Sequence, residues 1–471
     1  MYRTRVIDCL LRCLLAALLV AWLGVNPANG QQTGPAPAAS GGGSSTDPDF
    51  LVTADQVLNE MSQITGWKLK SPLKKSIRTR EEIHAYILSE MNDEKDAKER
   101  YASGRSAEAF GLIPKHFDLD TFLVDLLTEQ IAGLYDPKKH EFYIADWIPA
   151  DDQRMVMSHE LTHALQDQYF NIEAWERAAK PNDDAELARD SVLEGSATAG
   201  MLEYILKDKG IDLLKLPDFD PSTFIGDMND TPMLKKAPAF IKDSLMFPYF
   251  EGLRFSMSVL RTEGWSGFAN VFANPPMGTQ QIMHPDLYRG RVVPEPIKLD
   301  LPDGVPGESW NKLEENCMGE FGWKEVLKQF LNEERASKLA FEWNGDDYAT
   351  YEQKENKNLM LFTRTRFNTP EAANNFFQAY SEVFKKKYPD RTPTLSGQED
   401  LEFATPDTGG VFLQCIGKEC VTLEGGDAKL FSEWTKKLGW PVPLPSPHTP
   451  AKTVGTVQTR RAGVSVALAA D

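Results

Sequence analysis

Two histidines four residues apart give the strongest chemical signal in this chain. The stretch 155–170 reads MVMSHELTHALQDQYF and contains the pattern H-E-x-x-H as His159, Glu160 and His163. Residues four apart on an α-helix lie one turn apart on the same face, so both imidazoles can bind one metal ion. Glu160 lies about 100° around the helix, beside the open position of the ion, where it can take a proton from bound water. The pattern therefore predicts a Zn2+ site with Glu160 as general base.

The residues around this pattern favour a helix. Its side opposite His159 is apolar and consists of Met157, Leu161, Ala164 and Leu165. Asp151 or Asp152 can cap the N-terminus of the helix. Asp167 follows His163 by one turn and can accept its second ring proton or hold a neighbouring ligand.

A catalytic zinc site needs a third protein ligand and an open fourth position. We expect Glu194 to be this ligand, on a second helix that covers about residues 185–207. The residues from 195 to 200 are only Gly, Ser, Ala and Thr, and such small side chains let two helices approach closely. Gly195 costs the helix about 1 kcal/mol against alanine, which indicates a packing reason. The alternative is that Glu194 is one of many surface glutamates, for instance like Glu186 or Glu203.

The metal helix followed by a glutamate on a later helix resembles the gluzincin family of zinc metallopeptidases. The shared pattern covers the two helices only. The resemblance implies that His159, His163 and Glu194 hold zinc and that Glu160 is the general base. It also implies a mainly helical, zincin-like catalytic domain with a small edge sheet.

The sequence departs from the thermolysin-like members of that family at Thr198. Those enzymes carry an aspartate at this position, one turn after the ligand glutamate, which orients a ligand histidine. Asp190 or Asp167 can supply the carboxylate instead, and the residues leave that choice open. The resemblance therefore extends to the broad group and not to the thermolysin family itself.

A donor for the developing oxyanion is the remaining catalytic requirement. The run HPDLY places His284 and Tyr288 on a short irregular element after the helical residues, and we expect this pair to act as that donor. The alternative is a turn histidine packed by Pro285.

The N-terminal residues predict export. Residues 1–30 combine three arginines with an uncharged apolar stretch and small residues near Gly30, as in a signal peptide, and 31–48 form a flexible linker rich in Gly, Ser, Ala and Pro. We therefore expect a secreted or periplasmic protein, with an uncleaved membrane anchor as the alternative. An oxidising location permits a disulfide, and Cys415 and Cys420 bracket a turn where a bridge would fit, which leaves Cys317 free.

The composition limits the partners. The 471 residues carry a formal net charge of −18, which argues against binding to nucleic acid. We expect a peptide or protein substrate, and no stable membrane insertion unless the leader is retained. The oligomeric state is not indicated.

The order of the patterns predicts the α+β class. Residues 49–300 form the zincin-like domain, with helices up to about residue 128, two short strands between 130 and 147, and an irregular excursion over 208–242. After a Pro-rich boundary, 307–439 form a smaller α+β domain for support or substrate recruitment, and 440–471 form a disordered tail. In this second domain we expect helices at 323–331, 333–339, 370–387 and 428–437, a turn at 344–347, a strand at 359–367 and a hairpin at 411–423.

The sequence thus predicts an exported zinc-dependent metallopeptidase. Two other functions fit the same residues. One is a different metal-dependent hydrolase, because H-E-x-x-H specifies the metal chemistry better than the scissile bond. The other is an exported binding or scaffold protein with a structural zinc site.

Overall fold

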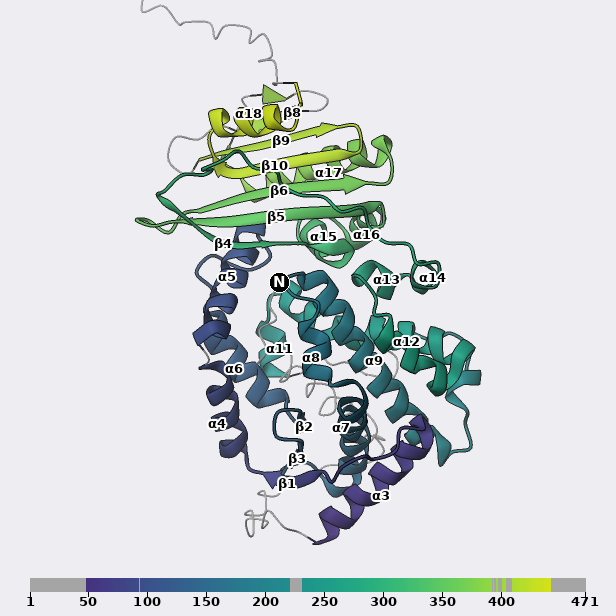
Figure 1. Cartoon of the computed structure of the whole chain (residues 1–471). Helices are drawn as coiled ribbons and strands as arrows, with labels where there is room; N and C mark the ends of the chain where they lie inside the picture. The colour runs from purple at the N-terminus through teal and green to yellow at the C-terminus, as the bar shows by residue number, and fades with distance from the viewer. Residues whose placement is uncertain are drawn as a thin grey trace, which may run out of the picture.

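The computed structural model describes residues 48–92, 94–220, 231–391, 393, 395–396, 400–403 and 409–441. The predicted signal peptide, the linker up to residue 47 and the tail beyond residue 441 lie outside this range, as does the centre of the predicted excursion. The α+β class is confirmed: helices dominate the N-terminal half, and a large sheet dominates the C-terminal half (Figure 1).

Helices build the N-terminal half. They are α3 (Pro48–Thr65), α4 (Arg80–Met91), α5 (Glu94–Phe110), α6 (Leu119–Gln130), α7 (Ala150–Phe170), α8 (Ile172–Arg177), α9 (Asp183–Lys207), η1 (Leu213–Lys215), α11 (Pro232–Lys236), α12 (Ala239–Ala273), α13 (Thr279–Met283) and α14 (Pro285–Arg289). The helix α5 lies within the residues predicted to be helical, but its charged sequence gave no sign that one face packs against the large sheet.

A small sheet lies beside α7. Its strands are β1 (Lys74–Arg78), β2 (Gly133–Asp136) and β3 (Glu141–Ala145), in the order β1-β3-β2. The two predicted strands are β2 and β3, which pair antiparallel, whereas β1 was not predicted and pairs parallel to β3. The strand β2 is therefore an edge strand, and both β2 and β3 contact α7.

The C-terminal half is built on a seven-stranded antiparallel sheet of order β4-β5-β6-β10-β9-β8-β7. Its strands are β4 (Trp310–Asn316), β5 (Trp343–Gln353), β6 (Leu359–Phe367), β7 (Leu395–Ser396), β8 (Asp400–Phe403), β9 (Gly410–Ile416) and β10 (Glu419–Gly426). Its helices are α15 (Gly319–Lys328), α16 (Glu333–Ala340), α17 (Pro370–Lys387) and α18 (Ala428–Lys437). The predicted helices, the strand and the hairpin are all present.

The turn predicted at 344–347 is wrong. These residues belong to β5, where the register with β6 shifts between Trp343 and Asp346 and Gly345 has a φ of 127°. The Asn-Gly-Asp-Asp signal reflects this irregularity within a strand and not a chain reversal.

One hydrophobic core joins the two halves. It runs from the helices around α7 through α5, α15 and α17 to one face of the large sheet, and α18 covers a second cluster on the other face. Phe110 at the end of α5 lies edge-on to Trp323 of α15 and to Tyr348 of β5, with ring centroids 6.0 and 5.2 Å apart.

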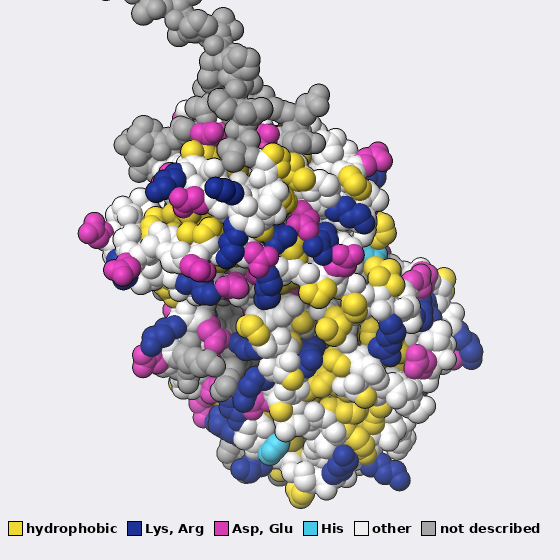
Figure 2. All heavy atoms as spheres, turned by 45° about the horizontal axis from the view of Figure 1, so that its top comes forward, with side chains coloured by type: hydrophobic (Ala, Val, Ile, Leu, Met, Phe, Trp, Pro, Cys, Tyr) yellow, Lys and Arg dark blue, Asp and Glu magenta, His cyan; other side chains and the backbone are white. Residues whose placement is uncertain are grey.

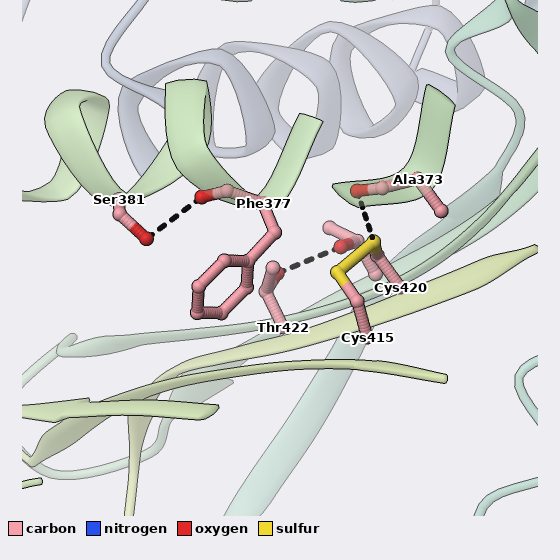
Figure 3. Close-up of a disulfide and its surroundings, with 7 residues drawn as sticks. Ala373, Phe377, Ser381, Cys415, Cys420 and Thr422 are labelled. Atoms are coloured by element: carbon pink, nitrogen blue, oxygen red, sulfur yellow. Dashed lines mark hydrogen bonds between the residues drawn. A yellow bond between two sulfur atoms is a disulfide. The ribbon is translucent and has the colours of Figure 1, made fainter. Parts of the chain in front are cut away.

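The predicted disulfide is confirmed. Cys415 and Cys420 are bonded, stand opposite each other in β9 and β10, and lie under α17 close to Ala373 (Figure 3). Cys317 is free, also as predicted. The hairpin is therefore covalently closed directly beneath a helix of the large sheet.

Two buried carboxyl groups accept hydrogen bonds at the beginnings of two helices. Asp184 of α9 accepts hydrogen bonds from the N–H and hydroxyl of Thr279, the first residue of α13, at 3.1 and 2.5 Å. Asp346 of β5 accepts from the N–H groups of Met318 and Gly319 at the start of α15, at 2.9 and 3.1 Å. Burial raises the pKa of Asp184 to about 7 and that of Asp346 to about 6, although these hydrogen bonds act in the opposite direction.

We expect the contribution of Asp184 to stability to depend on pH. Its pKa rises from 3.8 to about 7 on folding, so the folded protein favours the neutral form. The resulting stabilisation is fully present below pH 3.8 and is lost as the pH rises through 7. Relative to Asp184→Asn, which stays neutral, the free energy of unfolding of the wild type should fall by up to about 4 kcal/mol between pH 4 and pH 8. Urea denaturation of both proteins across this range tests it, and parallel profiles would contradict it.

The surface charges and the length of the apolar helices can be read from the structure. On the face shown in Figure 2, Lys and Arg side chains are interspersed with Asp and Glu, so neither sign dominates it. Within the described ranges, no helix is both long and apolar enough to cross a bilayer.

Candidate metal centre

The predicted metal helix is α7, which lies between α3, α9 and the strands β2 and β3. The predicted apolar side is confirmed, because it is fully buried at Met157, Leu161, Ala164 and Leu165. The cap predicted at Asp151 or Asp152 is wrong, because the helix already begins at Ala150.

Three side chains from α7 and α9 converge in the interior. Nε2 of His159 lies 3.1 Å from Oε2 of Glu194 and 3.1 Å from Nε2 of His163. Nε2 of His163 lies 3.5 Å from Oε1 of Glu194. All three residues are buried, and one ligand atom from each lies within 4.8 Å of the others, so the group could hold a metal ion. It is the one group of this kind among the residues that the structure describes.

The charge of Glu194 suits this role. Burial alone would raise the pKa of its carboxyl group, but the imidazoles of His163 and His159 outweigh burial and lower this pKa to about 2. Glu194 is therefore ionised at neutral pH, which is the form that binds metals.

A glycine contact between helices sets the position of Glu194. A Cβ atom on Gly195 would lie 2.0 Å from the carbonyl carbon of Gly252 in α12, and one on Gly252 would lie 2.2 Å from the carbonyl oxygen of Ser191. The backbones of α9 and α12 therefore touch directly beside Glu194. The packing reason predicted for Gly195 is confirmed.

An amide orients His163. Its Nδ1 lies 2.8 Å from Oε1 of Gln166, and the Gln166 amide donates to Ser196 Oγ at 2.8 Å. Ser196 is on α9, so this chain of hydrogen bonds links the two ligand helices. The sequence contains a signal for Gln166 that we missed, because this polar residue follows His163 by three positions on a buried helix.

Of the two carboxylates proposed for this outer role, Asp167 pairs with other residues. Asp167 accepts from the hydroxyl of Tyr135 at 2.7 Å and pairs with His140 Nδ1 at 3.1 Å, so it is not the partner of His163. Asp190 is buried on α9, one turn before Glu194. Nδ1 of His159 has no hydrogen-bond partner within the described part of the chain.

Glu160 is fully buried beside the three candidate ligands and faces β2. Its Oε2 accepts a hydrogen bond of 2.9 Å from the backbone N–H of Tyr135. This contact could not be predicted from the sequence, because a backbone group of Tyr135 makes it. The structure buries its side chain.

One aromatic residue near the centre was not predicted. The ring of Tyr249 on α12 lies 6.2 Å from that of His159, with 32° between their planes. Tyr249 is buried in an apolar Phe-Pro-Tyr-Phe run that reads as ordinary core. Only the crossing of α9 and α12 brings it to His159.

The oxyanion role expected for His284 and Tyr288 stays a prediction. Nε2 of His284 lies 2.7 Å from Oε1 of Glu320 on α15, and its ring packs against Phe341. The hydroxyl of Tyr288 donates to the carbonyl oxygen of Asn274 at 2.8 Å. Both side chains thus have partners away from the three candidate ligands.

Comparisons with known proteins reach only the C-terminal half. Residues 309–432 match a family described as a domain of unknown function, DUF8575. No curated protein and no solved structure matches the chain. Every residue of the candidate metal centre precedes the segment that matches this domain of unknown function.

Proposed function

We propose that this protein is an exported zinc-dependent metallopeptidase in which His159, His163 and Glu194 hold the ion. The observation that carries the proposal is the spacing of the donor atoms, which lie 3.1, 3.1 and 3.5 Å apart. Ligands of a tetrahedral zinc ion at about 2.0 to 2.2 Å lie about 3.3 to 3.6 Å from one another. The three side chains are therefore close to a zinc-binding arrangement.

The chemistry of the donors supports zinc. Two imidazole nitrogens and one carboxylate are one of the ligand sets found in catalytic zinc sites, whereas calcium and magnesium prefer oxygen ligands alone. The ionised state of Glu194 supplies the charge that a divalent ion needs.

The number of donors supports a catalytic site over a structural one. Structural zinc sites are closed by four protein ligands. Within the described ranges, His, Cys, Asp and Glu residues contribute three, from His159, His163 and Glu194. Three ligands leave one position for water or substrate.

The surrounding residues have definite roles in this proposal. A bound zinc ion supplies the Lewis acidity that activates water and polarises a carbonyl group. Glu160 accepts the proton of the attacking water and passes it to the leaving amine. The Tyr135 N–H holds one carboxylate oxygen of Glu160 during this transfer. Gln166 keeps His163 in the tautomer that offers Nε2 to the ion.

The resemblance of the metal helix and the later glutamate to the gluzincin peptidases supports a peptide substrate. The signal-peptide pattern at residues 1–30 and the Cys415–Cys420 disulfide support export, because disulfides persist in oxidising compartments.

The test is zinc-dependent hydrolysis by the purified protein. We expect about one zinc ion per chain and cleavage of members of a mixed peptide library, which a chelator stops and added zinc restores. Ester and amide substrates without a peptide backbone serve as the control. Cleavage of these alone would indicate a different hydrolase, and a protein that binds no zinc would overturn the proposal.

A further inference from the structure

Tyr135 contacts α7 at two points. Its backbone N–H donates to Oε2 of Glu160 at 2.9 Å, and its hydroxyl donates to Oδ2 of Asp167 at 2.7 Å. Glu160 and Asp167 are seven residues apart, which is close to two helical turns, so both lie on the same side of α7. One tyrosine on β2 thus spans the part of the helix that follows the general base.

Asp167 is itself fixed. Its Oδ1 accepts from the N–H of Ile172, the first residue of α8, at 3.2 Å, and its Oδ2 also pairs with His140 at 3.1 Å. The Asp167 side chain is 5% exposed. The hydroxyl of Tyr135 therefore binds a buried acceptor that the end of α7 and the start of α8 hold in place.

The strand β2 is also pressed against α7 before Tyr135. A Cβ atom on Gly133 would lie 2.6 Å from Cγ1 of Val156 and 3.3 Å from Cγ of Glu160. This contact sets the distance between the strand and the helix but not the position of the strand along the helix axis. The hydrogen bond from the Tyr135 hydroxyl to Asp167 fixes that position.

We infer that Tyr135 and Asp167 are positioning residues for the general base of the proposed peptidase. Their side-chain hydrogen bond fixes β2 along α7 so that the Tyr135 N–H meets Oε2 of Glu160. With one oxygen held, the carboxylate has a single orientation, and its Oε1 is the atom that exchanges the proton. This inference rests on the proposed function for its catalytic consequence.

The positioning role predicts a change in kcat alone, which a contact that only stabilised the fold would not produce. Loss of the Tyr135 hydroxyl should change the orientation of Glu160, which affects the proton transfer and not the binding of zinc or substrate. Small displacements of a reacting group can cost about a hundredfold in rate. The effect should therefore appear in kcat, with KM and zinc content unchanged.

The experiment compares Tyr135→Phe with Tyr380→Phe in the zinc-loaded protein. Tyr380 is a matched control, because it is fully buried in α17 and its hydroxyl has no hydrogen-bond partner in the described part of the chain. We expect kcat for a cleaved peptide to fall tenfold to a hundredfold in Tyr135→Phe only. Hydrogen–deuterium exchange at the Tyr135 amide should also become faster.

The amide measurement separates this inference from the proposed function. A wild type that cleaves no peptide, together with faster exchange in Tyr135→Phe, would support the positioning of Glu160 and overturn the peptidase. An active wild type with unchanged kcat and exchange in Tyr135→Phe would overturn the positioning role. Loss of zinc together with activity in Tyr135→Phe would also overturn it, because the tyrosine would then act on the metal site.

Discussion

Glu160→Gln is expected to abolish peptide hydrolysis while zinc stays bound. Glutamine has the same shape and keeps a carbonyl oxygen for the Tyr135 N–H, so the contact between α7 and β2 can persist. Its amide cannot accept a proton from water, and loss of a general base costs about 10²- to 10⁴-fold in rate. Peptide cleavage measured as kcat/KM, beside metal analysis of the same preparation, tests this expectation.

A second variant controls for the loss of a partly buried carboxylate. Glu203 is on α9, where it accepts a hydrogen bond from the Trp265 indole at 2.9 Å, away from the three candidate ligands. Glu203→Gln should keep full activity and full zinc content. Substantial hydrolysis by Glu160→Gln would refute the assignment of the general base and leave the metal ligands untouched.

Glu194→Ala should lose zinc. The change removes the one negative ligand and leaves two neutral imidazoles, so binding of a divalent ion loses both a bond and its charge compensation. Loss of an outer partner of a metal ligand costs about 10- to 100-fold in affinity, which we expect for Gln166→Ala. Glu194→Ala should exceed that loss. Competition with a chelator of known zinc affinity measures both variants on one scale.

Glu203→Ala is the control for this comparison, because it shortens a glutamate of the same helix at a distance from the imidazoles. It should bind zinc like the wild type. If Glu194→Ala also did so, the third ligand would lie elsewhere, and Asp190, one turn earlier on α9, would be the next residue to test. If Gln166→Ala and Glu194→Ala lost the same amount of zinc affinity, Glu194 would be a residue that supports a metal ligand and not a ligand itself.

Local patterns in the sequence predicted the parts of the centre that lie on single helices. His159 and His163 are related by the helical repeat alone, so their common face could be predicted without a fold. Gly195 marked a close helix crossing because glycine within a helix is costly unless something requires it. The hairpin of Cys415 and Cys420 followed from the alternation of its two strands around a turn.

Contacts between distant segments could not be predicted. The Tyr135 N–H that binds Glu160 carries no residue-specific signal, since every residue but proline has this group. Tyr249 reaches His159 only through the crossing of α9 and α12. Asp346 looked like a turn residue because its burial at the start of α15 depends on a sheet that the sequence did not reveal in full.

The position of Phe110 limits how far the C-terminal half can be treated as a separate module. By sequence it closes a helix of the N-terminal half, yet its ring fills a space between Trp323 and Tyr348 within residues 309–432, the segment that matches a family of its own. The interior packing of that segment therefore includes an aromatic side chain that lies outside residues 309–432. Excision at residue 309 would remove Phe110 and expose to solvent the apolar side chains of Trp323 and Tyr348 that it contacts.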